Sequence, residues 1–373
     1  MQCVTPMIRY YKIYTPEEKK RLKAEGKKQF NKIIPRDRVL KGLEIDPNYL
    51  RHWVFEENER LEQTHSLRRY QLIPCRNCWA CNLKYSAEWA QRIMFECSLH
   101  QHNYFITLTY DELNLPLPES ATYNGVTYEN DGTWSGTLYT KDVDKFLNTW
   151  RKRLERKGFT GLKYFYCGEY GPTGPNSETG SLGHRPHYHM IAMNAPLDIT
   201  EFYDFDKKNG KLIWKSHELD EIWDKGFCEI GEVEFASAAY VARYCMKKLT
   251  TNKDKTYYYS QGKEPEFVRM SRRPGIGSEY YEQHKEEIYE TDNIPFKNFH
   301  GKTINYKPNH AWDKKFEEEF PERFEEIKQS RIEASERSRK LLQELTNATD
   351  LQRLEQAAEK IITKGKMLPR EDI

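Results

Sequence analysis

The chain has 373 residues, and its 59 Lys and Arg nearly balance its 57 Asp and Glu, which leaves a formal net charge of +2. This balance excludes a uniformly basic surface but not a basic patch. Aromatic residues make up 13% of the chain, enough to build a core, and no apolar run approaches the roughly 20 residues of a membrane span.

The N-terminal region is basic, because residues 1–84 hold 18 Lys and Arg against 10 Asp and Glu. This asymmetry suggests an anionic partner, most often nucleic acid, and a solvated basic face without a partner is the alternative. Residues 1–14 lack the apolar segment of a secretory signal, so we expect a cytoplasmic protein with reduced cysteines. A cap at Thr15, with Pro16 and Glu18, predicts a short charged helix over 15–30.

Three cysteines follow one another at the spacing CxxCxxC: Cys75, Cys78 and Cys81. Their thiolates can share one tetrahedral Zn²⁺, and the fourth ligand must come from elsewhere. A helix predicted over 84–100 would carry Cys97 about 20 Å away. Cys3 is therefore the preferred fourth ligand of a structural zinc clip, and an iron–sulfur cluster or three reduced thiols are the alternatives.

The middle of the chain alternates strand and helix patterns. A β-branched and aromatic strand is predicted over 104–110, followed by a long loop or hairpin insert over 114–136. An amphipathic helix then ends at Gly158, and Arg151, Lys152 and Arg153 are among the cations that surround its apolar stripe. That stripe consists of Val143, Phe146, Leu147, Trp150 and Leu154.

Further elements are predicted as strands over 162–166, 186–193 and 227–235, helices over 216–225 and 237–249, an aromatic irregular region over 251–310, and charged helices over 313–364 with a break at Pro321. This order predicts an α+β fold with a central antiparallel sheet flanked by helices. A Cys-rich N-terminal region and a helical C-terminal tail complete it.

The segment around His187 and His189 is the most informative. Side chains of a strand alternate between its faces, so both imidazoles lie on one face while Tyr188 points to the core. Glu169, at the end of the preceding strand, reaches the same face if the two strands pair antiparallel. Two imidazoles and one carboxylate suit Mg²⁺ or Mn²⁺ acting on a phosphate. The alternative is ordinary surface histidines and a turn carboxylate.

Two tyrosines of the helix predicted over 237–249, Tyr240 and Tyr244, are one turn apart and project side by side. Cations follow them in the chain: Arg243, Lys247 and Lys248. A phenol is a weak nucleophile at neutral pH, but a neighbouring cation favours its phenolate and a metal-held phosphate is a better electrophile. Two such tyrosines could perform two transesterifications in turn, and a pair that packs the helix onto the sheet is the alternative.

Taken together, these segments resemble the HUH endonuclease superfamily, and within it the replication initiation proteins of Microviridae (gokushovirus-like) single-stranded DNA phages. The resemblance covers roughly residues 70–280. Its co-linear blocks are residues 74–81, 105–110, 165–171, 185–189, 240–248 and 264–277. One departure is that Tyr240 is followed after three residues by Arg243, whereas Tyr244 is followed by Lys247.

The resemblance implies a rolling-circle initiator that nicks one strand at the phage origin. One tyrosine keeps the 5′ phosphate as a phosphotyrosine and frees a 3′-OH, and the displaced strand is later rejoined. The implied metal ligands for Mg²⁺ or Mn²⁺ are His187, His189 and Glu169. The implied catalytic residues are the nucleophiles Tyr240 and Tyr244, with assistance from Lys247 and Lys248.

The resemblance also implies single-stranded and origin DNA as partners, with a helicase and polymerase of the host, in the cytoplasm of the infected bacterium. Expected DNA contacts are phosphate neutralisation by Arg151, Lys152, Arg153 and Arg243, and base stacking by Tyr257 and Tyr258. The implied regions are a basic Cys-containing region over 1–100, an HUH-type catalytic domain over 101–250, an aromatic extension packing on it over 251–310, and a charged tail over 311–373.

Three alternatives stay open at this point. A plasmid relaxase or transposase would keep the superfamily and change the biology. A non-catalytic zinc-containing DNA-binding protein would tolerate the loss of both tyrosine hydroxyls. A metal hydrolase that uses water as the nucleophile would form no covalent intermediate between protein and DNA.

Overall fold

The computed structural model describes residues 7–34, 50–76, 79–171, 185–208, 211–250, 255–297, 303–346 and Gln356. The chain divides into two compact units, each described here by itself. Unit 1 comprises Met1–Cys81, Glu286–Pro295 and Asn305–Leu368, and unit 2 comprises Asn82–Lys285, Phe296–Ile304 and Pro369–Ile373. Among the described helices, none is long and apolar enough to cross a membrane.

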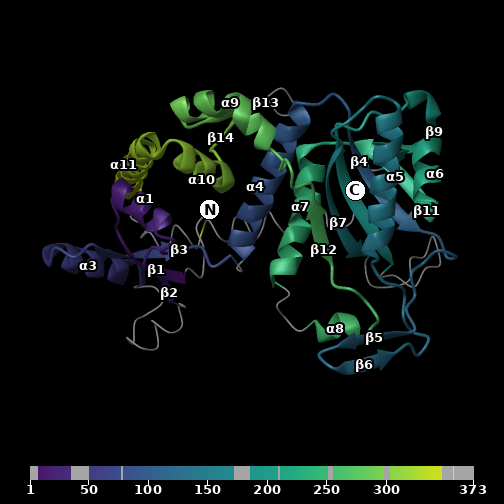
Figure 1. The fold of residues 1–373 in the computed structure, drawn as a ribbon, viewed down its shortest axis with the longest axis horizontal. Helices are drawn as coiled ribbons and strands as arrows, with labels where there is room; N and C mark the ends of the chain where they lie inside the picture. Colours follow the sequence, from purple (N-terminus) through teal and green to yellow (C-terminus); the bar gives the residue numbers. More distant parts are fainter. Residues whose placement is uncertain are drawn as a thin grey trace. The chain divides into compact units, whose positions relative to one another are not determined.

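Unit 2 is built on a seven-stranded sheet in which every neighbouring pair is antiparallel (Figure 1). The order across the sheet is β12 (Phe267–Met270), β7 (Lys163–Tyr170), β8 (Pro186–Met193), β4 (Asn103–Tyr110), β11 (Gly226–Glu232), β10 (Lys211–Ser216) and β9 (Phe202–Lys208). The predicted α+β class with a large antiparallel sheet is therefore confirmed. The strand that holds both histidines, β8, lies between β7 and β4.

One face of this sheet is covered by α5 (Thr140–Arg156) and α6 (His217–Trp223) (Figure 1). The alternate residues Tyr188, Met190 and Ala192 of β8 point into the core beneath these helices. The predicted apolar stripe of α5 is confirmed, because the buried residues of this helix are Val143, Phe146, Leu147, Trp150 and Leu154. This face is consequently a continuous apolar core.

The opposite face packs against α4 (Trp79–Ser98) and α7 (Phe235–Thr250) (Figure 1). Phe165 of β7 and Ile191 of β8 join Ile93 of α4 and Val241 of α7 in a second buried cluster. Strand residues two apart share a face, so Glu169, His187 and His189 lie on this side of the sheet. The sheet thereby places its polar site residues under α7.

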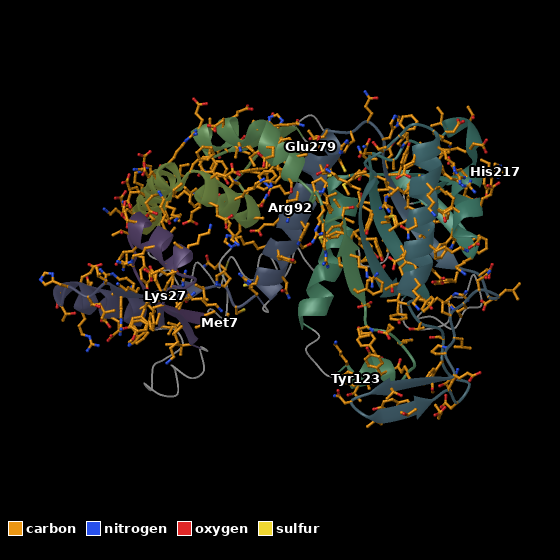
Figure 2. The ribbon with its side chains drawn as sticks, in the orientation of Figure 1. Met7, Lys27, Arg92, Tyr123, His217 and Glu279 are labelled. Carbon is orange, nitrogen blue, oxygen red and sulfur yellow. The ribbon has the colours of Figure 1, made fainter. Side chains whose placement is uncertain are left out.

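The prediction of an irregular region over 251–310 is wrong. The described residues of this stretch form α8 (Thr256–Tyr259), β12, α9 (Ser278–Thr291), β13 (Ile294–Lys297) and β14 (Thr303–Tyr306). The short strand β12 becomes ordered by pairing with β7, which no local pattern reveals. The hairpin alternative for 114–136 is confirmed by β5 (Ser120–Tyr123) and β6 (Val126–Glu129), whose Tyr123 stacks on Tyr259 of α8 at 4.7 Å (Figure 2).

Unit 1 contains a three-stranded antiparallel sheet that the sequence did not predict. Its order is β2 (Asn31–Ile34), β1 (Met7–Lys12) and β3 (Arg68–Ile73), with α3 (Leu50–Gln63) packed on β3. Its strands are rich in Arg, Lys and Tyr, so they lack a clear apolar alternation. The capping box of Thr15 and Glu18 starts α1 (Pro16–Ala24), which ends before Gly26 at φ +64°.

Unit 1 also holds two C-terminal helices, α10 (His310–Glu319) and α11 (Pro321–Leu345). The predicted break at Pro321 is confirmed, since this proline lies in the first turn of α11. Phe316 stacks on Tyr289 at 3.8 Å between ring centroids. Arg331 joins the two segments by ion pairs to Asp292 and Asp313.

A buried ion pair stabilises unit 2 at the start of β7. The Glu96 carboxylate of α4, fully buried, accepts hydrogen bonds from Lys163 Nζ at 2.5 Å and from the Gly277 amide at 2.7 Å. His100 lies 3.0 Å from the same carboxylate, and Glu279, at the start of α9 (Figure 2), lies 3.3 Å from Lys163. Burial raises the pKa of Glu96, but these hydrogen bonds outweigh it and hold the pKa below its ordinary value of 4.5.

We predict that Glu96→Gln lowers the free energy of unfolding by about 3 kcal/mol at pH 7, because it strips a buried ammonium of its main counter-charge. The folded-state pKa of Glu96 is depressed, so its contribution is complete above about pH 4.5 and is lost as the pH falls below that value. Urea denaturation at pH 7, 5 and 4 should therefore show the gap between wild type and variant narrowing. Glu155→Gln, at an exposed position of α5, is the matched control and should change stability by less than about 0.5 kcal/mol.

Candidate metal and tyrosine site

Two neighbouring strands position the acidic and imidazole groups of the site. In the antiparallel register of β7 and β8, Glu169 stands opposite His187, and Cys167 stands opposite His189. Directly opposed residues point to the same face with their Cβ atoms about 5 Å apart. The strand alternation therefore brings the three predicted metal ligands together, although Glu169 and His187 are 18 residues apart in the chain.

Three polar groups converge on one carboxylate oxygen. Glu169 Oε1 lies 2.9 Å from His187 Nε2 and 2.8 Å from His189 Nε2. The Tyr240 hydroxyl, from α7, donates to the same oxygen at 2.8 Å. Glu169 and His189 are buried, while His187 and Tyr240 are half-buried. The site is thus a polar pocket under α7 that opens on the side of His187 and Tyr240.

Each imidazole is held by a partner at its other nitrogen. His187 Nδ1 donates to the Arg185 carbonyl at 3.1 Å, because a carbonyl only accepts. His189 Nδ1 lies 3.0 Å from the Thr107 hydroxyl of β4, and the ring stacks on Phe105. These partners fix the rings and leave both Nε2 atoms to face the carboxylate, as in metal sites whose ligands are oriented from outside. Sequence reasoning gave Thr107 no role, since its register opposite His189 comes from the pairing of β4 with β8.

The electrostatics of the pocket favour the metal-binding protonation states. Burial raises the pKa of Glu169, but hydrogen bonds from His187 and His189 outweigh it and lower the pKa to about 2. Glu169 is therefore a carboxylate at neutral pH. Burial lowers the pKa of His189, an effect larger than the opposing one of its bond to Glu169, so its imidazole is neutral and can act as a ligand.

The donor set fits a divalent cation. One nitrogen or oxygen from each of Glu169, His187 and His189 lies within 4.8 Å of the other two. Glu169 Oε2 is buried and accepts no hydrogen bond from any described residue, so it is a second oxygen without a partner. Two imidazoles and a carboxylate with open positions suit a first-row or Mg²⁺-type cation. A second acidic cluster of Glu96, His100 and Glu279 is neutralised by Lys163, and we assign it no metal.

The predicted tyrosine helix is present as α7, which continues to Thr250. The ring of Tyr240 lies against His189 with 5.2 Å between centroids. Position 244 follows one helical turn later, and positions 247 and 248 lie about another turn beyond it. The side chains of Arg243, Tyr244, Lys247 and Lys248 are outside the part of the chain that the structure describes, so their roles stay predictions.

The expected DNA contacts on α5 lie on the sheet face opposite the site, because α5 covers the face of Tyr188. Arg153 pairs with Glu221 of α6 at 3.0 Å, and Arg151 bonds Asn148 at 3.2 Å. The cations of α5 thus serve at least partly to join α5 to α6. Lys152 is exposed on the same helix.

The tyrosines of α8 lie beside the end of β7. Tyr257 exposes 60% of its surface, whereas the hydroxyl of Tyr258 donates to Glu266 at 3.5 Å. The ring of Tyr258 packs against Tyr170, the residue after Glu169, with 6.4 Å between centroids. Of the two predicted stacking residues, Tyr257 therefore offers the freer ring.

The cysteine cluster is described in part. The Sγ atoms of Cys75 and Cys81 are 4.0 Å apart, near the roughly 3.8 Å between two thiolates on one tetrahedral Zn²⁺. Cys3 and Cys78 lie outside the described residues. Cys97 is buried in the core cluster under α4 and α7, and burial raises the pKa of its thiol far above the ordinary value. Cys97 is accordingly a core residue, as the helix spacing predicted.

An antiparallel sheet that carries a His–His–Glu group, with a tyrosine from a covering helix bonded to the carboxylate, defines the kind of site. The chain matches the model of a phage family described as "Replication-associated protein ORF2" over residues 103–249, which run from β4 through α7. It is 35% identical over 269 residues to replication-associated protein ORF2 of Spiroplasma virus 4, covering 71% of this chain and 75% of that protein.

Two further phage proteins are similar. Replication-associated protein VP4 of Bdellovibrio phage phiMH2K is 28% identical, covering 58% of this chain and 60% of that protein. Replication-associated protein ORF4 of Chlamydia phage 1 is 23% identical, covering 64% of this chain and 53% of that protein. No solved structure matches the chain. The chain belongs to the family of replication-associated proteins of Microviridae phages, as its sequence blocks indicated.

We predict that Mn²⁺ binds this site at one ion per chain and that His187→Ala and His189→Ala each weaken binding by about 100-fold or more, since each removes a direct ligand. Thr107→Val, which removes the partner of His189 Nδ1, should weaken it by roughly 10-fold to 100-fold. Titration followed by the electron paramagnetic resonance of free Mn²⁺ measures these affinities. His102→Ala, at an exposed position before β4, is the matched control, and unchanged affinity in the ligand variants would remove the metal from this site.

Proposed function

We propose that this protein initiates rolling-circle replication of a phage genome by nicking one strand of the origin through a tyrosine. The observation that carries the proposal is the hydrogen bond from the Tyr240 hydroxyl to the carboxylate that also faces His187 and His189. A nucleophile and a group of metal ligands are thereby held within one contact of each other. The names of the related phage proteins support a role in genome replication.

The chain's own residues would act as follows. His187, His189 and Glu169 would hold Mg²⁺ or Mn²⁺, which when bound supplies Lewis-acid polarisation of the scissile phosphate. The bond to Glu169 orients the Tyr240 oxygen toward that phosphate and limits its rotation. The new bond joins this oxygen to phosphorus, and the bond to the 3′ oxygen breaks.

The exchange balances without an external energy source. The phenol loses one proton and the departing 3′ oxygen gains one, while one phosphodiester replaces another as a 5′-phosphotyrosine. Glu169, with a pKa of about 2, is too weak a base to take the phenol proton, so it serves as ligand and orienting group. The neighbouring cations predicted at Lys247 and Lys248 would favour the phenolate.

Tyr244, one turn beyond Tyr240 on α7, would serve the second exchange. After one round of synthesis it would attack the regenerated origin, and the freed 3′-OH would rejoin the displaced strand. The 3′-OH left by the first nick is a primer, which makes a polymerase and a helicase of the host the expected functional partners. Tyr257, exposed at the end of β7, is a candidate for stacking the incoming strand.

We predict a covalent adduct when the protein is incubated with labelled single-stranded origin DNA and Mn²⁺. The adduct survives a denaturing gel and disappears with EDTA. Tyr240→Phe and Tyr244→Phe should each reduce it, and the double variant should abolish it, because phenylalanine keeps the ring and removes the nucleophile. Tyr203→Phe, on the distant edge strand β9, is the matched control.

The other outcomes select the alternatives. Cleavage without an adduct would assign a hydrolase that uses water. Binding without cleavage, on DNA shown to contain the origin, would leave a DNA-binding protein without catalysis. An adduct that persists in the double variant would move the nucleophile to another residue.

We also propose that Cys75, Cys78 and Cys81 hold a structural Zn²⁺, with Cys3 as the fourth ligand. The 4.0 Å approach of Cys75 and Cys81 supports this reading. Purified protein should then contain one zinc per chain by mass spectrometry of the metals. Cys75→Ser and Cys3→Ser should lose it, whereas Cys228→Ser, at a buried core thiol, should keep it; a zinc content unaffected by the first two variants would exclude these ligands.

A further inference from the structure

A large aromatic side chain is exposed on the same sheet face as the candidate site. Phe227 of β11 leaves 61% of its surface accessible, although it belongs to the strand next to the centre of the sheet. Its neighbours in the strand alternation, Cys228 and Ile230, are buried on the opposite face under α5 and α6. Phe227 therefore points to the face of His187, where an apolar ring gains nothing from solvent.

The sheet register aligns Phe227 with the site. Phe227 stands opposite Thr109 of β4, Thr109 stands opposite His187 of β8, and His187 stands opposite Glu169 of β7. The four side chains form one row across four adjacent strands. At about 4.8 Å between strands, Phe227 lies roughly 10 Å from His187, which is about three nucleotides at the 3.4 Å stacked rise of a DNA strand.

The backbone that carries this ring is fixed on both sides. The Asp111 amide donates to the Lys225 carbonyl at 2.9 Å, and the Trp223 indole donates to the Thr109 carbonyl at 2.8 Å. Gly226 has φ +150°, and a Cβ there would lie 2.3 Å from the Thr109 oxygen, so only glycine allows this approach of β11 to β4. The ring is consequently presented from a rigid strand and not from a loop.

The charged groups near this end of the row are paired. Arg185 binds Glu112, and Lys225 lies 3.6 Å from Asp142. Both of these cations thus already have a carboxylate partner. A ligand that seats on Phe227 is therefore recognised by its flat apolar surface more than by charge.

We propose that Phe227 is a stacking platform for one base of single-stranded DNA, close to the phosphate that the site would cleave. The proposal rests on the function proposed above and adds a contact that positions the strand across β8, β4 and β11. Stacking on one aromatic ring is tolerant of base identity, because every base has a flat face. Phe227 would accordingly affect affinity and register more than sequence choice.

The first test measures binding of a labelled single-stranded origin oligonucleotide to the full chain. Phe227→Ala and Phe227→Leu should weaken the Kd by about 10-fold, whereas Phe227→Trp keeps it, since only the last retains an aromatic face. The dependence of the Kd on salt should be unchanged, because no phosphate contact is removed. Phe159→Ala, at an exposed phenylalanine beyond the other end of β7, is the matched control.

The second test locates the base. Single abasic sites are placed within about three nucleotides of the nick on either side. One position should weaken wild-type binding as much as Phe227→Ala does, and that abasic site should have no further effect in the variant. Equal Kd values for wild type and Phe227→Ala, a lowered melting temperature in Phe227→Ala, or abasic effects that simply add would overturn the proposal.

The two proposals fail separately. If wild type forms the tyrosine adduct and Phe227→Ala binds as well as wild type, the nicking function stands and the stacking platform falls. If no adduct forms, the nicking function falls, and abasic sites walked along the whole oligonucleotide still decide whether one base couples to Phe227. A protein that binds no single-stranded DNA would overturn both.

Discussion

The convergence of three donors on Glu169 Oε1 is the constraint around which unit 2 is organised. A buried carboxylate is costly unless hydrogen bonds compensate it, and here they come from two residues of β8 and one of α7. A slip of one residue between β7 and β8 would turn both imidazoles into the apolar core. The same three bonds therefore fix strand register, helix position and the proposed chemistry.

The two faces of the sheet divide these tasks. The face under α5 and α6 is apolar throughout, and its rim is closed by pairs such as Lys157 with Glu218 at 2.8 Å. The other face combines an apolar middle with polar groups at the two ends of β7. Lys163 at one end pairs with Glu96 of α4, and Glu169 at the other end faces the histidines and Tyr240. Stability and reactivity are thus separated along a single strand.

Much of the site was predictable because its parts are local patterns. The alternation over 186–193 placed His187 and His189 on one face, and the helical spacing of Tyr240 and Tyr244 placed both on α7. The stripe of α5 was equally clear, since its apolar period is complete. The strands of unit 1 and the short strand β12 were missed, because they are polar or brief and are defined by their partners.

The sequence by itself determined the family, the α+β class and the residue types of a metal and tyrosine site, since each follows from spacing along a few residues. Only the tertiary structure decided that Glu169 stands opposite His187, that Thr107 orients His189, and that Phe227 shares their row. It also placed the cations of α5 on the far face of the sheet. The reason is that pairing between distant strands sets these relations, and no local period of side chains records which strands become neighbours.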